Sequence, residues 1–416
     1  MNNSANPSTN SSTNSSILAG VRVLDIAHQY SGANAASLLG DLGAEVLCIE
    51  HPDGSPIRTM LPKKDGESMW WKVIQRGKKT VTLNLSSTKG REIFLELVSK
   101  FDVLIENFRP GTLEKWGIGP EDIERTGANI AMLRISGFGQ TGPMRNQPGF
   151  GVIAEAMSGF AHLNGYPEGP PTFPSTTLGD GVASVFGVFG VMAAMVEKLR
   201  TGKKGVQVID VALFEALFRI IPTQVAAFDV MGKVPIRPGN FLGMHGVLRN
   251  VYKAKDGKYF CVGAVGSQAI RRVLAGADAG PLVERVDQGV MDAGDMAIVQ
   301  AFLNECNVHL EDWASHRPYA ELAADMAKSG AVHGAVFDVS DIVSNEHFQA
   351  RDDLIRVEDS TFGSVLMQGV IPKFPGREHK VAHAGRAIGA DNAEVYQTLL
   401  GFSEEKIRQL KAEGIL

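Results

Sequence analysis

An aspartate flanked by glycines is the residue of this sequence best suited to covalent chemistry. Asp180 stands in Leu178-Gly179-Asp180-Gly181, just before a stretch of small and apolar residues with helical spacing. At a helix start a carboxylate accepts hydrogen bonds from first-turn amides, so an N-cap is one interpretation. The glycines leave the carboxylate uncovered and the helix N-terminus supplies donors for an oxyanion, so a nucleophile toward a thioester is the other. The local pattern favours the cap.

Two basic segments have the composition of a binding site for a phosphorylated ligand. Arg76-Gly77-Lys78-Lys79 follows two tryptophans and precedes a predicted strand, and Asn107-Phe108-Arg109-Pro110-Gly111 follows another strand. In a doubly wound sheet, ligands bind at the rim formed by the strand ends. The two lysines fit phosphate groups and Phe108 offers a stacking face. The alternative is a pair of solvated turns.

Several common cofactor and catalytic motifs are missing from the sequence. The segment Ala27–Asn34, between the first predicted strand and its helix, has one glycine in place of the G-x-G-x-x-G fingerprint of dinucleotide-binding folds. Without that fingerprint, Glu50 at the end of the next strand is interpreted as a surface charge. The ten histidines show no metal-ligand spacing, and neither a G-x-S-x-G elbow nor a P-loop occurs.

The composition is that of a soluble globular protein and excludes two classes of partner. Of 416 residues, 44% are hydrophobic, and 41 basic against 46 acidic residues give a net charge of −5. That balance leaves no basic field for nucleic acid or anionic lipid. The apolar stretches near 182–195 and 212–227 are interrupted by glycine or by charged residues and proline, so no membrane span is predicted.

The cysteines and the N-terminus bear on the compartment. Three cysteines lie far apart without a C-x-x-C pair, so a disulfide framework is not predicted and a reducing compartment, the cytoplasm, is expected. Residues 1–16 are rich in Asn, Ser and Thr and lack the basic and apolar parts of a signal peptide. They are predicted to be a disordered tail.

Strands and helices alternate along most of the chain. This order predicts an α/β fold, with a mostly parallel, Rossmann-like sheet covered by helices on both faces. The predicted strands are 21–26, 44–50, 80–85, 102–106, 130–136 and 206–211, and the helices are 35–42, 89–100, 120–126, 182–200 and 213–231.

The alternation breaks near residue 230. A hairpin is predicted from 251–254 and 259–265, joined across Asp256-Gly257, and helices follow it. Residues 230–333 are therefore predicted to form a small α+β domain. The large domain would comprise 17–229 and 334–416, including a sheet-like segment at 354–371 and a terminal pair of helices.

Segments spread over most of the chain together resemble the class III coenzyme A transferases, the formyl-CoA transferase-like family. Several such segments in the same order are more specific than any one of them. They are Val23-Leu24-Asp25 with His28, Leu42–Val46 with Ile49-Glu50, Arg76–Thr80, Glu106–Gly111, Ser136–Pro143, and Gly169–Thr172 with Leu178-Gly179-Asp180.

The resemblance places the family's catalytic aspartate on Asp180 and reverses the local preference for a cap. It implies transfer of CoA from an acyl-CoA to a free carboxylic acid through an aspartyl-CoA thioester, with no cofactor besides CoA itself. It also implies an interlaced homodimer. The positions that it places near bound CoA are His28, Lys78, Lys79, Asn107, Phe108 and Lys115.

Departures from the formyl-CoA transferase pattern concern the substrate pocket. Phe150 and Gly151 replace a tyrosine and a glutamate, and Tyr30 replaces a glutamine. The family's mobile glycine-rich loop aligns with Gly239–Gly246, which is bulkier. A larger acid is therefore expected, such as a dicarboxylic acid with succinyl-CoA as donor, its far carboxylate bound by Arg58 or His245. The predicted pocket comprises Tyr30, Arg58, Phe150, Gly151, Gly243, His245 and Gly246.

Two other activities are compatible with the same resemblance. An α-methylacyl-CoA racemase would need a histidine and an aspartate in Pro148–Ile153, and neither is present. A CoA-binding homologue without catalysis is the third possibility, since a fold does not imply a function. The presence of Asp180 between glycines argues against it.

Overall fold

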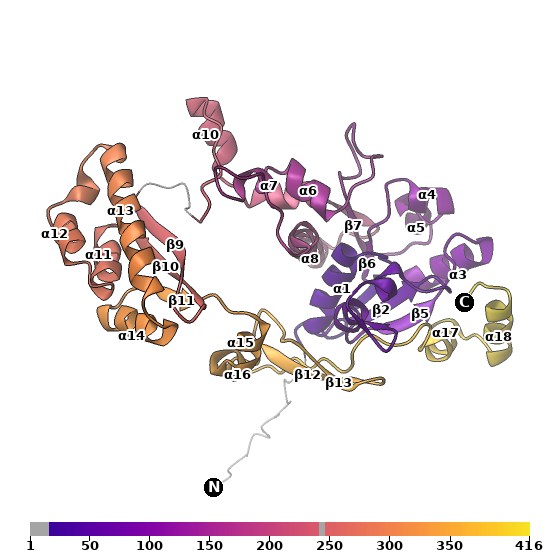
Figure 1. Ribbon diagram of the computed structural model, residues 1–416. Coiled ribbons are helices and arrows are strands. Elements are labelled where there is room, and N and C mark those ends of the chain that lie inside the picture. The colour runs from indigo at the N-terminus through magenta and orange to yellow at the C-terminus, as the bar shows by residue number, and fades with distance from the viewer. Residues whose placement is uncertain (1–15, 241–245) are drawn as a thin grey trace, which may run out of the picture. The chain divides into compact units, whose positions relative to one another are not determined.

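The computed structural model describes residues 16–240 and 246–416 (Figure 1). The predicted tail therefore lies outside the described residues, except for Ser16. Two compact units make up the described chain. The larger consists of 16–158, Pro174–Ile221 and His347–Leu416, and the smaller of Gly159–Phe173 and Pro222–Glu346. The smaller unit thus extends beyond the predicted 230–333 at both ends.

A six-stranded parallel sheet organises the larger unit, in the order β5-β2-β1-β6-β7-β8. The predicted α/β class with a mostly parallel sheet is confirmed. The chain builds outward from β1 to β5 and then returns to place β6 on the other side of β1, so the strand order reverses between β1 and β6. The strands are β1 (Arg22–Asp25), β2 (Glu45–Glu50), β5 (Lys79–Thr82), β6 (Val103–Glu106), β7 (Ala131–Ser136) and β8 (Gln207–Ala212).

Apolar side chains alternate between two cores, one on each face of this sheet. Val103 and Ile105 of β6 belong to one core and Leu104 to the other, as expected for a strand covered on both sides. Helices α1 (Tyr30–Asp41) and α8 (Leu178–Thr201) contribute to the first core. Helices α3 (Thr88–Val98) and α17 (Asn392–Leu400) contribute to the second (Figure 1).

Glycines let α8 approach the sheet closely. A Cβ atom at Gly187 would lie 2.8 Å from Leu133 Cδ2, and one at Gly190 would lie 2.7 Å from Ile209 Cγ2. Larger residues there would push the helix away from β7 and β8. Within the described residues, α8 is also the one helix long and apolar enough to cross a membrane, a criterion that core helices of soluble proteins meet as well.

The prediction of one helix over 213–231 is wrong, because two shorter helices occupy this region. They are α9 (Leu213–Arg219) and α10 (Gln224–Met231). Pro222, between them, has no amide hydrogen to donate and disfavours helical geometry at the residue before it. The boundary between the two units falls at the same point, between Ile221 and Pro222.

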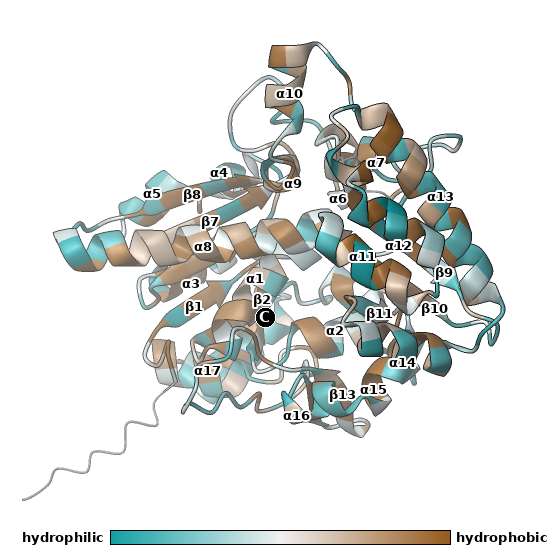
Figure 2. Ribbon diagram, turned by 90° about the vertical axis from the view of Figure 1, so that its left-hand side faces the viewer, coloured by the Kyte–Doolittle hydropathy of each residue, from teal (hydrophilic) through white to brown (hydrophobic). Residues whose placement is uncertain are grey.

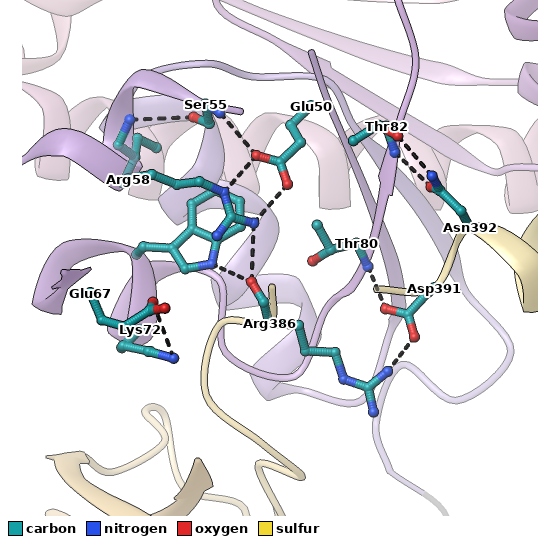
Figure 3. Close-up of polar contacts among 12 residues, drawn as sticks. Glu50, Ser55, Arg58, Glu67, Lys72, Thr80, Thr82, Arg386, Asp391 and Asn392 are labelled. Carbon is teal, nitrogen blue, oxygen red and sulfur yellow. Dashed lines mark hydrogen bonds and ion pairs between the residues drawn. The ribbon is translucent and has the colours of Figure 1, made fainter. Parts of the chain in front are cut away.

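The C-terminal segment closes the β5 edge of the sheet with side chains (Figure 3). Asp391 Oδ2 accepts a hydrogen bond from the Thr80 amide at 2.7 Å, and Asn392 Oδ1 accepts one from the Thr82 amide at 2.8 Å. On an edge strand these amides would otherwise be free to pair with another chain.

The other elements of this unit are η1 (Pro56–Thr59), β3 (Lys63–Lys64), β4 (Glu67–Ser68), α2 (Met69–Ile74), α4 (Thr112–Trp116), α5 (Pro120–Glu124), α6 (Gly151–Met157), β12 (Leu354–Asp359), β13 (Gly363–Gln368) and α18 (Glu404–Ala412). Helix α16 (Glu346–Ala350) starts at the unit boundary.

The smaller unit contains an antiparallel sheet in the order β11-β10-β9, backed by helices. Alternate residues of the hairpin, such as Tyr252, Phe260 and Val262, are buried in a core with these helices. The predicted hairpin is confirmed, although β9 starts at Val247, earlier than 251. The elements are α7 (Phe160–Leu163), α10, β9 (Val247–Lys253), β10 (Tyr259–Val265), α11 (Ser267–Gly276), α12 (Gly280–Asp287), η2 (Val290–Asp292), α13 (Met296–Ser315), α14 (Tyr319–Ser329), β11 (His333–Ala335) and α15 (Val339–Ser344).

Candidate active site

A cavity lies at the carboxyl ends of the strands where the order of the large sheet reverses. The chain leaves β1 through Ala27 and His28 and leaves β6 through Asn107 and Phe108, so parallel pairing brings these two segments together. In open α/β sheets this position is the usual ligand site. The cavity has a volume of about 200 Å³, and its lining includes His28, Glu50, Ser86, Phe108 and Trp116.

Three aromatic side chains form one wall of this cavity. The His28 and Phe108 rings are stacked with centroids 4.5 Å apart, and Trp116 meets Phe108 edge-on at 5.0 Å. Burial lowers the pKa of His28, so its imidazole is neutral at neutral pH. Such a wall suits a planar heterocycle. The sequence analysis did not include Trp116, although it stands one residue after Lys115.

A buried ion-pair network holds the loop that carries Phe108. Glu106 accepts hydrogen bonds from the Phe108 amide and from Arg134 Nε, both at 2.7 Å. The same guanidinium donates to Glu114 of α4 at 2.7 Å. Burial raises the pKa of Glu106 to about 7, against the opposing effect of Arg134. A buried charge is tolerated when it is paired and hydrogen-bonded in this way.

Asp180 lies in the first turn of α8 and does not cap it. The N-cap residue is Thr177, which makes no side-chain capping hydrogen bond, so the N-cap interpretation of Asp180 is wrong. The Ser31 side chain acts to lower the pKa of Asp180, against the larger effect of burial. Oδ2 lies against Gly151, where a Cβ atom would be only 2.2 Å away. The glycine that departs from the formyl-CoA transferase pattern therefore makes room for this carboxylate.

The surroundings of Asp180 favour its protonated form. Burial raises the pKa of Asp180 to about 6, and the nearby Glu155 carboxylate adds to the shift. Glu155, on α6, is itself buried and accepts a hydrogen bond from the Gly179 amide at 3.2 Å. In the part of the chain that the structure describes, no lysine, arginine or histidine forms an ion pair with Asp180. Glu155 was not identified from the sequence.

Tyr30 forms an aromatic wall beside Asp180. Burial and the charge of Asp180 raise the pKa of Tyr30, and the Thr177 side chain acts in the opposite direction. The Trp70 ring meets Tyr30 edge-on, with centroids 5.3 Å apart. Tyr30, Trp70 and Thr177 line a second cavity of about 460 Å³, and Arg76 also contributes to its lining. The sequence placed Trp70 next to a basic run without assigning it to the pocket.

The three lysines predicted near CoA differ in their surroundings. The Lys78 ammonium is fully buried, 2.8 Å from Asp25 Oδ2 and 2.7 Å from the Ala33 carbonyl oxygen, so here it ties β5 to β1 and α1. Lys79 is exposed at the start of β5 and pairs with Glu394 at 2.6 Å. Lys115 is exposed on α4, beside Trp116 of the cavity wall.

Arg58 has partners within its own unit (Figure 3). It binds both oxygens of Glu50, at 2.8 and 2.7 Å, and its guanidinium lies 3.5 Å from the centroid of the Trp71 ring. The Arg386 carbonyl oxygen accepts a further bond from Arg58 at 3.0 Å. Glu50 is 5% exposed, so its interpretation as a surface charge is wrong.

The remaining predicted pocket residues belong to different parts of the chain. Phe150 immediately precedes α6 and is 62% exposed. Gly246 belongs to the smaller unit and precedes β9. Gly243 and His245 lie outside the described residues.

Comparison with known proteins decides the family. A model of the family described as CoA-transferase family III matches residues 18–392. The chain belongs to this family. CoA-transferase family III enzymes act on CoA thioesters, so this chain is an enzyme of the CoA-transferase class.

Relatives with named substrates match the chain over nearly its whole length. The succinyl-CoA–L-malate CoA-transferase beta subunit of Chloroflexus aurantiacus is 35% identical over 403 residues, which cover 96% of this chain and 98% of that protein. The succinyl-CoA–D-citramalate CoA-transferase of the same organism is 32% identical over 405 residues, with 96% and 98% covered. A CAIB/BAIF family protein from Brucella suis has a TM-score of 0.80 at 26% identity, covering 92% of this chain and 100% of that one.

Proposed function

We propose that this CoA-transferase moves CoA from succinyl-CoA, or another dicarboxylic acyl-CoA, to a free carboxylic acid through covalent intermediates on Asp180. The observation that carries the proposal is the setting of Asp180, a carboxylate without a cation partner among the described residues that lies against Gly151. Relatives 32% and 35% identical are named for succinyl-CoA as donor, which supports the donor class.

The first half of the proposed reaction uses Asp180 twice. Its carboxylate oxygen attacks the thioester carbonyl, an O–C bond forms, the C–S bond breaks, and CoA leaves as a thiolate. The thiolate then attacks Cγ of Asp180 in the resulting anhydride. A C–S bond forms, the anhydride C–O bond breaks, and the donor acid leaves as a carboxylate. The acceptor carboxylate reverses these steps, so no proton is consumed.

The position of Asp180 fits this sequence of steps. Its pKa of about 6 leaves it ionised at neutral pH but more basic than an ordinary aspartate. The first turn of α8 presents amide donors for negative charge that develops on the reacting carbonyls. Because no cation is paired with it, the carboxylate keeps its lone pairs for attack.

We propose that CoA occupies the cavity at the ends of β1 and β6. The stacked His28 and Phe108 rings and the edge of Trp116 would hold the adenine. Exposed Lys115, next to this wall, is available for a phosphate. Lys78, with two buried protein partners, would instead hold the strands that shape the site.

We propose that the pocket for the acyl groups is wider than one for formate or oxalate. Gly151 removes a side chain next to Asp180. The Tyr30–Trp70 pair bounds a cavity of about 460 Å³, which Thr177, three residues before Asp180, also lines. Arg58 is already bound to Glu50, so the far carboxylate would need a different partner, which leaves His245 of the predicted pair.

A homodimer is proposed from the family resemblance and from an apolar face on α8. Much of α8 is coloured hydrophobic in Figure 2. Phe189 and Leu199 of this helix are 71% and 85% exposed, and Val185 and Val196 are also exposed. Contiguous exposed apolar residues mark interaction surfaces. Light scattering during size-exclusion chromatography should give the mass of a dimer. The mass of a monomer in this measurement would contradict this part of the proposal.

The activity test follows both CoA thioesters and both free acids. The full-length protein is incubated with succinyl-CoA and a panel of mono- and dicarboxylic acids, and the CoA thioesters are identified by mass spectrometry. The expected result is a new acyl-CoA formed in equal amount to succinate, with parallel double-reciprocal plots. Binding of CoA without turnover for any donor would contradict the proposal, and solvent deuterium entering the α-carbon of an acyl-CoA would favour the racemase.

A further inference from the structure

Helix α6 meets the first turn of α8 at two points beside Asp180. At the start of α6, Gly151 lies against Asp180 Oδ2, and its carbonyl oxygen would be only 3.1 Å from a Cβ atom at Gly179. One turn further along α6, Glu155 Oε1 accepts a hydrogen bond from the Gly179 amide at 3.2 Å. Glu155 and Gly179 are both buried. Close packing and a side-chain hydrogen bond therefore both join α6 to the turn that carries Asp180.

Glu155 supplies a cap that α8 lacks in its own sequence. The N-cap residue, Thr177, makes no side-chain capping hydrogen bond. The first amides of a helix have no partner inside the helix, and a side chain at the N-cap usually accepts from one of them. Here the acceptor for the Gly179 amide comes from a neighbouring helix. Without Glu155 this buried amide, immediately before Asp180, would lose its partner.

We propose that Glu155 is a positioning residue, which holds the first turn of α8 against α6 so that the Asp180 carboxylate keeps its place beside Gly151. This inference rests on the proposed function, in which Asp180 is the nucleophile. A reacting group that moves by about 1 Å loses on the order of 10² in rate. A hydrogen bond to the residue next to Asp180 restrains such a movement.

The charge of Glu155 has a second consequence for Asp180. The positive end of a helix dipole favours an ionised carboxylate and so makes it less basic. Glu155 opposes this effect, because burial and then the Glu155 charge raise the pKa of Asp180. A neutral cap would hold the turn equally well but would leave Asp180 a weaker base.

Other titratable groups on the elements packed against α8 have little access to Asp180. These elements are α1, α6, α9, β7 and β8. Among the described residues Tyr30 of α1 is the other group coupled to Asp180. The further charged side chains of these elements are bound to other groups or exposed, and they are Asp41, Arg134, Asp210, Glu215 and Arg219. The other charged residues of α8 itself lie near its C-terminal end.

Three variants of the full-length protein separate the hydrogen bond from the charge. Glu155→Gln keeps an acceptor oxygen and loses the charge, whereas Glu155→Leu loses both. The matched control is Asp295→Ala in the smaller unit. Asp295 accepts a hydrogen bond at 2.8 Å from the amide of Ala297, the second residue of α13, just as Glu155 accepts one from the second residue of α8.

Two measurements are made on each variant. Hydrogen–deuterium exchange with mass spectrometry follows the peptides that contain residues 177–181, and it does not require turnover. Steady-state kinetics with succinyl-CoA and an acceptor acid gives kcat and KM between about pH 4 and 8, which spans the shifted carboxyl.

Glu155→Leu should exchange the first turn of α8 faster and lose about 10²-fold in kcat, with a KM for succinyl-CoA within about threefold. Glu155→Gln should restore slow exchange and regain at least about tenfold of the lost kcat. In this variant the acid limb of kcat/KM should move from about pH 6 toward the ordinary aspartate value near 4. Asp295→Ala should change neither the exchange at residues 177–181 nor the kinetics.

Native exchange and native kcat in Glu155→Leu would overturn the inference, and so would an equal loss of kcat in the Gln and Leu variants. If Glu155→Leu does not fold, the pH limb of Glu155→Gln still decides, because an unmoved limb would contradict the role of the charge. Absence of turnover in the native protein would overturn the proposed function alone, since exchange would still report on the contact between Glu155 and Gly179.

Discussion

Two regions of the large unit contain a buried carboxyl group with a raised pKa, yet they are built in opposite ways. Glu106, with a pKa of about 7, lies between Arg134 and the Phe108 amide. Asp180, with a pKa of about 6, has a serine hydroxyl and a second carboxylate, Glu155, as neighbours. The first carboxylate is neutralised by its partners and the second is not.

The difference separates a structural carboxylate from the one proposed to react. Burial alone raises a carboxyl pKa in both regions, so a shifted pKa does not by itself identify a nucleophile. What distinguishes Asp180 is the absence of a paired cation among the described residues and the glycine that faces Oδ2. Each carboxylate oxygen of Glu106 accepts a hydrogen bond from a protein donor, and the residue holds the Phe108 loop that lines the cavity at the ends of β1 and β6.

The largest expected effect is that of Asp180→Asn on activity. An amide is not a nucleophile toward a thioester, so transfer should fall by roughly 10⁴-fold or more. The affinity for CoA, measured by calorimetry, should stay within about threefold, because the cavity at β1 and β6 does not include this residue. Transfer within tenfold of native would remove the distinction between the two carboxylates.

Arg134→Met should have the largest effect on stability. Both Arg134 and Glu106 are nearly inaccessible to solvent, at 6% and 1% exposure, and removing one partner leaves an uncompensated buried charge. Chemical denaturation should show a loss of about 3–5 kcal/mol in the free energy of unfolding. The control is Lys89→Met, which removes an exposed pair with Glu413 and should cost less than about 1 kcal/mol. Equal losses would mean that the buried pair is not structural.

Gly151→Ala should affect activity more than stability. Its Cβ atom would lie 2.2 Å from Asp180 Oδ2, so the carboxylate must move. A displacement of about 1 Å costs on the order of 10² in rate. Gly181→Ala, on the other side of Asp180, meets only the Tyr30 hydroxyl oxygen at 3.8 Å and should lose far less. Steady-state kinetics of the two variants decides whether Gly151 is required beside the nucleophile.

The pH dependence should show the smallest effect. Only ionised Asp180 attacks, and its pKa is about 6, so kcat/KM should fall about tenfold for each pH unit below that value as the carboxyl becomes protonated. Above about pH 7, kcat/KM should not change with pH. If kcat/KM instead begins to fall only near pH 4, burial and Glu155 do not raise the pKa of Asp180.

The sequence predicted the architecture because it depends on local periodicity. Strand and helix patterns from Val21 to Ala212 account for the parallel sheet, and the placement of the catalytic aspartate on Asp180 by resemblance stays a prediction. The Arg134 pairing depends on the register of β6 against β7, and the burial of Lys78 depends on β1 and α1 packing over it, which no local pattern reveals. Pro222 was visible in the sequence, yet the apolar run around it was interpreted as one helix.

The most direct test of the central claim is covalent trapping at Asp180. The protein is incubated with succinyl-CoA, treated with borohydride, digested, and mapped by mass spectrometry. Borohydride reduces an aspartyl thioester to the alcohol, so the predicted result is homoserine at position 180 that depends on the acyl-CoA and is lost in Asp180→Asn. Intact Asp180 in a protein that turns over succinyl-CoA, or reduction at another carboxylate, would contradict the account.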